Sequence, residues 1–302
     1  MKKNVYNKLK AIVEKGYVKR NFDLIEYNTY RVHCIAKTCV IINSIETFAK
    51  TMVICNECGI KPIILGNGSN VILKNAKIDG VVIIFGSKFS NVYNIKNYVI
   101  AEAGTSLAKV MSYAKSVGLS GIENLSGIPA SIGGAVAMNA GAFGEDIGKY
   151  VSSALVYHNG KISEWKKEDF DFGYRYSRLQ DNDAIVLRVE LKLVKKNKEE
   201  IDETIRDIIS KRNTTQKLLY PCAGSVFKNG NNYFAGELID KCGLKNYNIN
   251  NAYVSDFHAN FIENRGNATG EDIVELIECI RNVVLDKFGI NLELEQKIIG
   301  EK

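Results

Sequence analysis

Two glycine-rich segments hold the residues best suited to bind an anionic ligand through the backbone. The first is the run Leu65-Gly-Asn-Gly-Ser-Asn70. Its small residues let backbone N–H groups approach an anion, and its Ser and Asn side chains add donors. This composition is typical of a loop that holds a diphosphate, although a short glycine turn is by itself more often only a turn. The spacing is not G-x-G-x-x-G at the start of a helix, so it does not predict a Rossmann site.

The second segment covers residues 127–144, G-I-P-A-S-I-G-G-A-V-A-M-N-A-G-A-F-G, with five glycines and five alanines. So few large side chains cannot build a packed element of their own. The segment must either fit closely against another backbone or line a flat ligand. Pro129 fixes φ near its start. A packing seam remains an alternative, but together the two segments favour an extended dinucleotide ligand.

A β-α-β unit is expected to deliver the first loop at the end of a strand. Residues 38–42 are β-branched and apolar, which predicts a strand. Ser44 can cap a helix whose apolar residues recur at helical spacing, and Gly59 can end it. Residues 62–65 then form a short buried strand that runs directly into the glycine loop.

A second α+β region surrounds the longer glycine segment. We expect a strand at 98–103, a helix capped by Thr105 and ended by Gly118, and a hairpin turning at Asn-Gly 159–160. Residues 184–194 alternate as a strand.

The charged run at 195–200 is the expected boundary before a C-terminal region. There we predict a charged helix over 199–212 and a strand near 252–255. A long helix begins at the capping box Thr269-x-x-Asp272. Its expected buried face comprises Ile273, Leu276, Ile277, Ile280 and Val284.

The composition is that of an ordinary globular enzyme. The 302 residues are 46% hydrophobic and 25% charged, which suits two or three domains. No apolar run approaches the roughly 18 residues that a membrane helix needs. The polar N-terminal sequence lacks the apolar stretch of a secretory signal. We therefore expect a cytoplasmic protein with no membrane partner. We also expect a monomer, although neither composition nor hydropathy indicates the oligomeric state.

The net charge of +6 has two interpretations. A nucleic-acid-binding protein concentrates its basic residues on one face, which predicts salt-dependent affinity for DNA or RNA. Here the lysines are scattered, and the tightest run, at 195–198, is followed at once by two glutamates. The pattern favours an enzyme that handles anionic phosphates, with no nucleic-acid partner.

The seven cysteines do not predict a disulfide framework, because their number is odd and their spacing irregular. Cys55 and Cys58 form a C-x-x-C at the end of the predicted helix. No second C-x-x-C exists and only three histidines are present, so a zinc site lacks ligands. We expect no metal and a structural role for this pair.

Five motifs occur in one order and resemble the UDP-N-acetylenolpyruvoylglucosamine reductase (MurB) family. They are G-N-G-S-N, the 127–144 segment, G-Y-R-Y-S, A-G-S-V-F-K-N and L-E-L-E-Q-K-I-I-G. The resemblance extends from about residue 28 to residue 300 and favours the shorter type II branch. It implies an α+β protein with the FAD-binding fold of the vanillyl-alcohol-oxidase (PCMH-like) proteins. The expected domains are two FAD-binding α+β subdomains, 1–83 and 84–196, and a C-terminal α+β substrate-binding domain, 197–302.

The resemblance also implies the cofactor contacts. The first loop would hold the diphosphate of non-covalent FAD, and the longer segment would line the rest of the cofactor. Arg31 lies in an early segment that approaches FAD in the family. The expected cofactor residues are Arg31, Gly66, Asn67, Gly68, Ser69, Asn70, Gly127, Ile128, Pro129, Ser131, Gly133 and Gly134.

The implied reaction takes hydride from NADPH to FAD and then to carbon C3 of an enolpyruvyl ether on a UDP-sugar. Negative charge then develops on C2 and its carboxylate, which requires a fixed cation and a proton donor. Arg175 suits the first role, because its planar fork can hold a carboxylate with two hydrogen bonds. Ser225 suits the second, provided that a neighbour such as Lys228 polarises its hydroxyl, and Glu295 would complete the set.

Plainer roles stay open for these residues. Arg175 could be a surface ion-pair residue, and Ser225 a turn serine. Glu293 and Glu295 alternate on a predicted strand and face the same side, so either could be the functional acid. Glu295 is preferred because it matches the second acid of the family's L-E-x-E pattern.

Further residues match family positions near the substrate: Tyr174, Arg212, Lys228, Asn229 and His258. Gly230 replaces a proline usual in the family after F-K-N, a change that would loosen the Ser225 loop. Lys217 stands where the family commonly has the proline of Q-P, so the resemblance does not carry the diphosphate contacts at that position. Cys222 could be an oxidation-sensitive thiol or an inert small residue. The alternative function is another flavin oxidase or dehydrogenase of the same fold acting on a different small molecule.

Overall fold

The computed structural model describes residues 5–13, 17–217 and 219–300. It forms two compact units. Unit 1 takes in the residues up to Arg20, residues 38–67 and residues 80–211; unit 2 takes in residues 21–37, residues 68–79 and the residues from Arg212 onward. Both units mix helices and strands, as the α+β class requires. The three-domain boundaries expected from the sequence stay a prediction.

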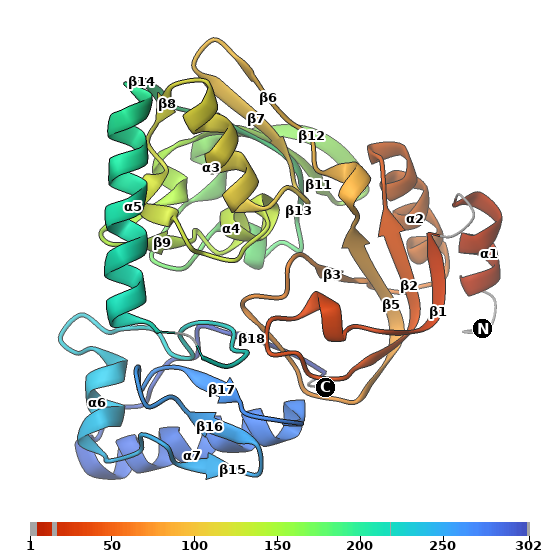
Figure 1. Cartoon of the computed structure of the whole chain (residues 1–302). Coiled ribbons are helices and arrows are strands. Elements are labelled where there is room, and N and C mark those ends of the chain that lie inside the picture. Colours follow the sequence, from red (N-terminus) through yellow and green to blue (C-terminus); the bar gives the residue numbers. More distant parts are fainter. Residues whose placement is uncertain (1–4, 14–16, 218, 301–302) are drawn as a thin grey trace. The chain divides into compact units, whose positions relative to one another are not determined.

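The largest sheet belongs to unit 1 and is antiparallel throughout (Figure 1). Its strand order is β12-β11-β13-β7-β6. Helices α3 and α4 pack against its central strands β7 and β13. The bounds are β6 Val92–Ile95, β7 Tyr98–Glu102, α3 Leu107–Ser116, α4 Ile132–Ala137, β11 Val151–His158, β12 Lys161–Lys166 and β13 Ile185–Lys192.

The predicted β-α-β unit is present at the start of unit 1. Helix α2 (Ile45–Glu57) begins after Ser44, whose Oγ accepts the N–H of Thr47 at 3.0 Å. Gly59 follows the helix in the left-handed region. Strand β3 (Ile63–Leu65) lies parallel to β5 and leads directly into the first glycine loop. The sheet has the order β1-β2-β5-β3, with β1 Val18–Asp23, β2 Ile35–Ile42 and β5 Lys77–Phe85.

One predicted helix cap is wrong. Ser106, not Thr105, caps α3, because its Oγ accepts the N–H of Lys109 at 3.2 Å. The hydroxyl of Thr105 is buried and donates to the carbonyl of Asn91 at 3.1 Å. The side chain expected to start the helix therefore fastens the preceding turn instead.

The hairpin prediction is confirmed. Strands β11 and β12 pair from His158 opposite Lys161, and Asn159 and Gly160 both have positive φ. Positive φ at both turn residues matches the twist of the two strands that a two-residue hairpin joins.

Unit 2 is built around the long helix α7 (Gly270–Phe288), which runs beside a three-stranded sheet of order β15-β16-β17 (Figure 1). Thr269 and Asp272 form the predicted capping box, and the predicted apolar face of α7 is buried. Strand β4 (Val71–Leu73) pairs in parallel with β18 (Lys297–Ile299). Gly270 passes so close to the carbonyl of Leu73 that no side chain would fit there. The sheet strands are β15 Asn248–Ile249, β16 Ala252–Val254 and β17 Ile262–Asn264.

The remaining helices and strands complete the fold. None of the helices among the described residues is both long and apolar enough to cross a bilayer. The remaining bounds are α1 Val5–Ile12, β8 Leu119–Ser120, β9 Gly141–Ala142, β10 Glu145–Asp146, β14 Val194–Lys195, α5 Lys198–Thr215 and α6 Ala235–Lys241.

Candidate functional site

A cavity of about 860 Å³ opens within unit 1 where the two glycine-rich segments meet. Four of the expected cofactor residues line it: Gly66, Ser131, Gly133 and Gly134. Sequence reasoning missed the rest of the wall, which is mixed. Its apolar side chains include Met52, Ile60, Ile64, Phe85, Tyr157 and Val186, and its polar ones are Asn56, Lys61, Asn159, Asn182 and Asp183. These side chains come from elements far apart in the sequence, so no local pattern marks them.

The two glycine segments are joined by contacts that leave no room for larger residues. A Cβ on Gly66 would overlap the Oγ of Ser131. A Cβ on Gly133 would lie 2.9 Å from the Cβ of Ala103. Asn67 donates from Nδ2 to the carbonyl of Pro129 at 2.5 Å. The expected pairing of the two segments is therefore present.

The two segments nevertheless use their N–H groups differently. The N–H groups of Ile132 and Gly133 donate to the carbonyls of Thr105 and Ala103, and that of Gly134 donates to the Oγ of Ser131. Among the described residues, none accepts a hydrogen bond from the N–H groups of residues 66–70. The available donors for an anion are thus in the shorter loop, while the glycines of α4 serve close packing.

In unit 2, the end of the first loop packs under residues 24–34. Gly68 is buried with φ +63°, and a Cβ there would collide with the carbonyl of Tyr27. The N–H of Thr29 donates to the carbonyl of Gly68 at 3.2 Å. The packing of residues 24–34 therefore requires a glycine at position 68, whether or not a ligand is bound nearby. Asn70 donates from Nδ2 to the backbone carbonyl of Glu295 at 3.1 Å.

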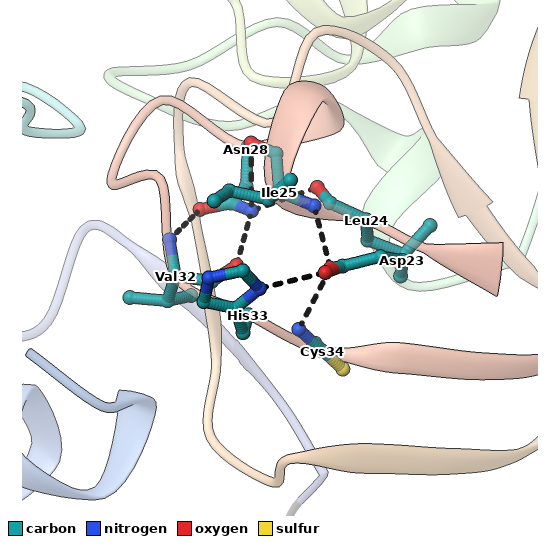
Figure 2. Close-up of polar contacts among 7 residues, drawn as sticks. All are labelled: Asp23, Leu24, Ile25, Asn28, Val32, His33 and Cys34. Carbon is teal, nitrogen blue, oxygen red and sulfur yellow. Dashed lines mark hydrogen bonds and ion pairs between the residues drawn. The ribbon is translucent and has the colours of Figure 1, made fainter. Parts of the chain in front are cut away.

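Hydrogen bonds of the Asn28 and Asp23 side chains hold the backbone of residues 24–34 in place (Figure 2). The buried Asn28 donates to the carbonyls of Leu24 and Val32 and accepts the N–H of Val32. The carboxylate of Asp23 lies 2.6 Å from Nδ1 of His33 and accepts the backbone N–H groups of Ile25 and Cys34. Burial raises the pKa of Asp23, but these hydrogen bonds outweigh it and leave the pKa below its usual value. The segment presents Arg31, which has φ +55° and pairs with Glu26.

Arg175 lies at the tip of a two-residue turn in unit 1. Gly173 and Tyr176 exchange backbone hydrogen bonds, and Arg175 itself has φ +54°. Its guanidinium donates to the carbonyl of Gly141 at 2.9 Å and lies 5.0 Å from the ring centre of Tyr174, which is 54% exposed.

Amide and hydroxyl side chains fasten this turn to the second glycine segment. Asn139, only 3% exposed, donates to the carbonyl of Gly173. Ser177 and Gln180 both donate to the carbonyl of Ala137. The turn that carries Arg175 is therefore built onto the end of α4, a connection that the sequence did not predict.

Ser225 is half-buried and lies on a loop of unit 2 whose backbone pairs with two other segments, at Ser225 and after it. It bridges Phe261, and Phe227 bridges Leu294. Asn260 holds Phe227 through both of its amide atoms, at 3.0 and 2.8 Å. Gly224, directly before the serine, has φ +72°.

The structure separates the two candidate acids. Residues 292–295 form a single bridge at Leu294 rather than the predicted strand. Glu293 is 69% exposed and pairs with Lys228 at 2.6 Å. Glu295 is half-buried, and its N–H donates to the carbonyl of Val226. The ammonium of Lys228, expected to polarise Ser225, is therefore engaged by Glu293.

The other expected substrate residues have varied surroundings. Burial lowers the pKa of Arg212, whose guanidinium donates to Gln216 at 2.9 Å. Burial also lowers the pKa of His258, whose ring lies 4.5 Å from that of Phe261. Asn229 accepts the N–H of Ala235 at 3.0 Å.

The residues that departed from the family pattern are also placed. Lys217 stacks on the ring of Phe257. Gly230 packs against Tyr233, whose ring a Cβ would overlap. Cys222 is buried, which raises the pKa of its thiol and favours an inert residue. Cys55 is likewise buried, which raises its pKa to about 12.

The cavity of unit 1 fits a flavin dinucleotide. Its volume lies within the range of about 300–1,000 Å³ that is usual for ligand sites, and its wall is apolar enough for flat rings. A Cβ on Gly66 would overlap the side chain of Ser131, and a Cβ on Gly133 would crowd Ala103. Next to this cavity, Gly66 and Asn67 leave backbone donors available for an anionic group.

Comparisons with known proteins agree with this geometry. Residues 36–164 match the FAD binding domain family model, and residues 216–299 match the model of the UDP-N-acetylenolpyruvoylglucosamine reductase C-terminal domain. A reductase of that name from Clostridium novyi is 40% identical over 99% of this chain and 97% of its own length. One from Alkaliphilus oremlandii is 37% identical over 100% of this chain and 99% of its own length. The crystal structure of UDP-N-acetylenolpyruvylglucosamine reductase from Thermus caldophilus matches with a TM-score of 0.80 and 34% identity, covering 93% of this chain and 98% of that one.

Proposed function

The chain belongs to the UDP-N-acetylenolpyruvoylglucosamine reductase family, and we propose that it reduces UDP-N-acetylglucosamine enolpyruvate to UDP-N-acetylmuramate for peptidoglycan synthesis. The observation that carries this proposal is the unit 1 cavity, formed where the two glycine-rich segments meet within an FAD binding domain. NADPH is the hydride source.

FAD, when bound in this cavity, would relay hydride from NADPH to carbon C3 of the substrate. In unit 1, Gly66 and Asn67 would offer backbone donors to the diphosphate. Gly133, Gly134 and Ser131 would shape the wall against which the cofactor packs. In unit 2, Ser69 and Asn70 belong to the same proposed set.

Arg175 would hold the carboxylate of the enolpyruvyl group. Hydride arriving at C3 moves negative charge onto C2 and the carboxylate, so a fixed cation lowers the barrier. The turn that carries Arg175 is held by Asn139 and Gln180, which keeps the guanidinium from reorienting as the charge develops. Tyr174 would offer its exposed ring as a contact surface.

Ser225 would give the proton to C2, and Glu295 would assist through hydrogen bonds to the reacting group. A serine hydroxyl is a weak acid, so its surroundings must stabilise the alkoxide as the proton leaves. Lys228 is paired with Glu293, so a role in polarising Ser225 would use one of the other two donors of its ammonium. Arg212, Asn229 and His258 would contact the rest of the UDP-sugar.

The visible spectrum of the purified protein is the first test. A flavin absorption band supports the proposal, and its absence after addition of FAD would overturn it. Mixing with NADPH in a stopped-flow instrument should bleach the band, and adding the enolpyruvyl sugar should restore it. Bleaching by NADPH without recovery by this sugar would favour another flavin oxidoreductase of the same fold.

Two further proposals concern its state in the cell. We propose that the protein works in the cytoplasm, where NADPH is available, and that it is a monomer. Cell fractionation and light scattering at assay concentrations test these statements. A membrane-bound fraction or a dimer mass would contradict them.

The steady-state kinetics should be of the ping-pong type, since NADPH and the sugar would use one pocket in turn. Double-reciprocal plots of the rate should therefore give parallel lines.

A further inference from the structure

We propose that Gln296, held by Tyr30, is a positioning residue that fixes the loop carrying Ser225 against the segment carrying Glu295. The inference rests on the proposed roles of Ser225 and Glu295. It goes beyond them, because it assigns a task to a pair that would touch neither substrate nor cofactor.

The side-chain amide of Gln296 is fully engaged. Only 1% of the residue is exposed. Its Nε2 donates to the carbonyls of Ala223 at 3.0 Å and Gly224 at 3.2 Å, the two residues before Ser225. Its Oε1 accepts the hydroxyl of Tyr30 at 2.9 Å.

These contacts fix which way the amide faces. A carbonyl can only accept, so the two carbonyls require the nitrogen side of the amide. The oxygen must then face Tyr30, and burial raises the pKa of Tyr30, which keeps its hydroxyl protonated as the donor. Of the two positions related by a flip of the Gln296 amide, only one therefore satisfies all of these partners.

Ser225 needs this support on one side only. After the serine, Asn260 and the bridge to Leu294 hold Phe227 in place. Before the serine, Gly224 has a positive φ and no side chain to restrict it. Gln296 donates to the carbonyls of both residues on this side, Ala223 and Gly224.

The same side chain adjoins the segment of the proposed acid. Glu295 directly precedes Gln296, and both N–H groups donate to the carbonyl of Val226, at 2.8 and 3.4 Å. Asn70 holds this stretch from the other side, through the carbonyl of Glu295 and the N–H of Lys297. A shift of Gln296 would therefore displace the serine loop and the acid together.

Tyr30 provides a rigid base for the pair. Its side chain is completely buried, and Asn264 donates to its backbone carbonyl at 2.8 Å. It belongs to the segment 24–34 that Asn28 closes (Figure 2). Losing the Tyr30 hydroxyl would leave Gln296 its two carbonyl contacts, so this change is the milder one.

The test compares Gln296→Met and Tyr30→Phe with wild-type holoenzyme. Gln296→Met keeps length and volume but removes every polar contact. We expect it to slow sugar reduction by about 100-fold, the scale of an ångström-sized misplacement at a reacting centre. The KM for the sugar and the rate of flavin reduction by NADPH should stay within about twofold of wild type, the error expected for independent sites. Tyr30→Phe should show the same pattern with a smaller loss.

A double-mutant cycle with Ser225→Ala separates positioning from general destabilisation. If Gln296 acts through the serine, adding Gln296→Met to Ser225→Ala should cost less than about twofold more. Thr269→Ala is the matched control, because it weakens unit 2 at the cap of α7 without touching either loop. It should leave sugar reduction at the wild-type rate.

The outcomes distinguish this inference from the proposed function. Normal sugar reduction by Ser225→Ala would overturn the proton-donor role, and this inference with it. A slow Ser225→Ala variant beside normal Gln296→Met and Tyr30→Phe variants would overturn the positioning role alone, as would fully additive losses in the cycle. Should Gln296→Met not fold, Tyr30→Phe, which keeps the ring and its packing, decides the question by the same criteria.

Discussion

The turn that carries Arg175 and the loop that carries Ser225 are fixed by different means. Arg175 has a left-handed backbone at the tip of a tight turn, and neighbouring side chains fasten that turn to carbonyls of the glycine segment. Ser225 has ordinary backbone pairing on one side and a single buried amide on the other. A left-handed conformation at a bulky residue costs about 1–3 kcal/mol, so the surroundings must impose it.

The difference shows that the proposed role of each side chain determines which part of the backbone must be held in place. A guanidinium on a long side chain must project from the backbone, and a strained turn aims it. A short hydroxyl must be delivered by the main chain itself, so the carbonyls before it are what need to be fixed. Five variants and one control test this comparison.

Ser225→Ala should have the largest effect. Removing the proposed proton donor should slow sugar reduction by about 10²- to 10⁴-fold, the usual contribution of general acid catalysis. Flavin reduction by NADPH should be unchanged, since no proton donor to C2 is needed there. Single-turnover traces of both steps check this, and equal losses in the two steps would argue against the assignment.

Arg175→Lys should come next. Lysine keeps the charge but cannot form the planar fork or replace the bond to Gly141. Losing one charged hydrogen bond, about 1.5–3 kcal/mol, corresponds to a loss of roughly 10- to 100-fold in kcat/KM. Arg178→Lys is the matched control, because the guanidinium of Arg178 is exposed and makes a long ion pair with Asp171, at 3.6 Å. A comparable loss in that control would show that the position is not special.

Asn139→Ala tests the fastening of the Arg175 turn. It leaves the half-buried carbonyl of Gly173 and the buried N–H of Gly148 without their side-chain partner. The free energy of unfolding should fall by about 2 kcal/mol. Urea denaturation measures this change, and a stability equal to wild type would mean that Asn139 does not help to hold the turn.

Glu293→Gln should have the smallest effect. Its ion pair with Lys228 is exposed, and such pairs contribute about 0.2–1 kcal/mol, or less than about fivefold in rate. Glu295→Gln should slow sugar reduction more than this. The reverse order in steady-state assays would identify Glu293 as the functional acid.

Local features were predictable from the sequence, while the supports of the site were not. The cap at Ser44, the hairpin at residues 159–160 and the capping box at Thr269 depend on neighbouring residues, and each is present. Thr105 was misassigned because two adjacent hydroxyls suit a cap equally well. Tyr30 and Gln296 are 266 positions apart, and a buried amide leaves no periodic pattern in the sequence.

Composition also had a limit in the second glycine segment. It predicted a ligand surface, and part of the segment does line the cavity. Its helical N–H groups, however, are already used by the carbonyls of Ala103 and Thr105. Glycine content indicates that a backbone is approached closely, but it cannot tell a ligand from another stretch of chain.

The pairing of β18 with β4 has a consequence for how the protein is made. Strand β4 emerges from the ribosome early, but its parallel partner is at residues 297–299. Residues 21–37 and 68–79 likewise belong to a unit whose remainder begins at Arg212. Translation must therefore pass through all of the intervening chain before this unit can close, and until then its early strands are exposed to chaperones and to misfolding.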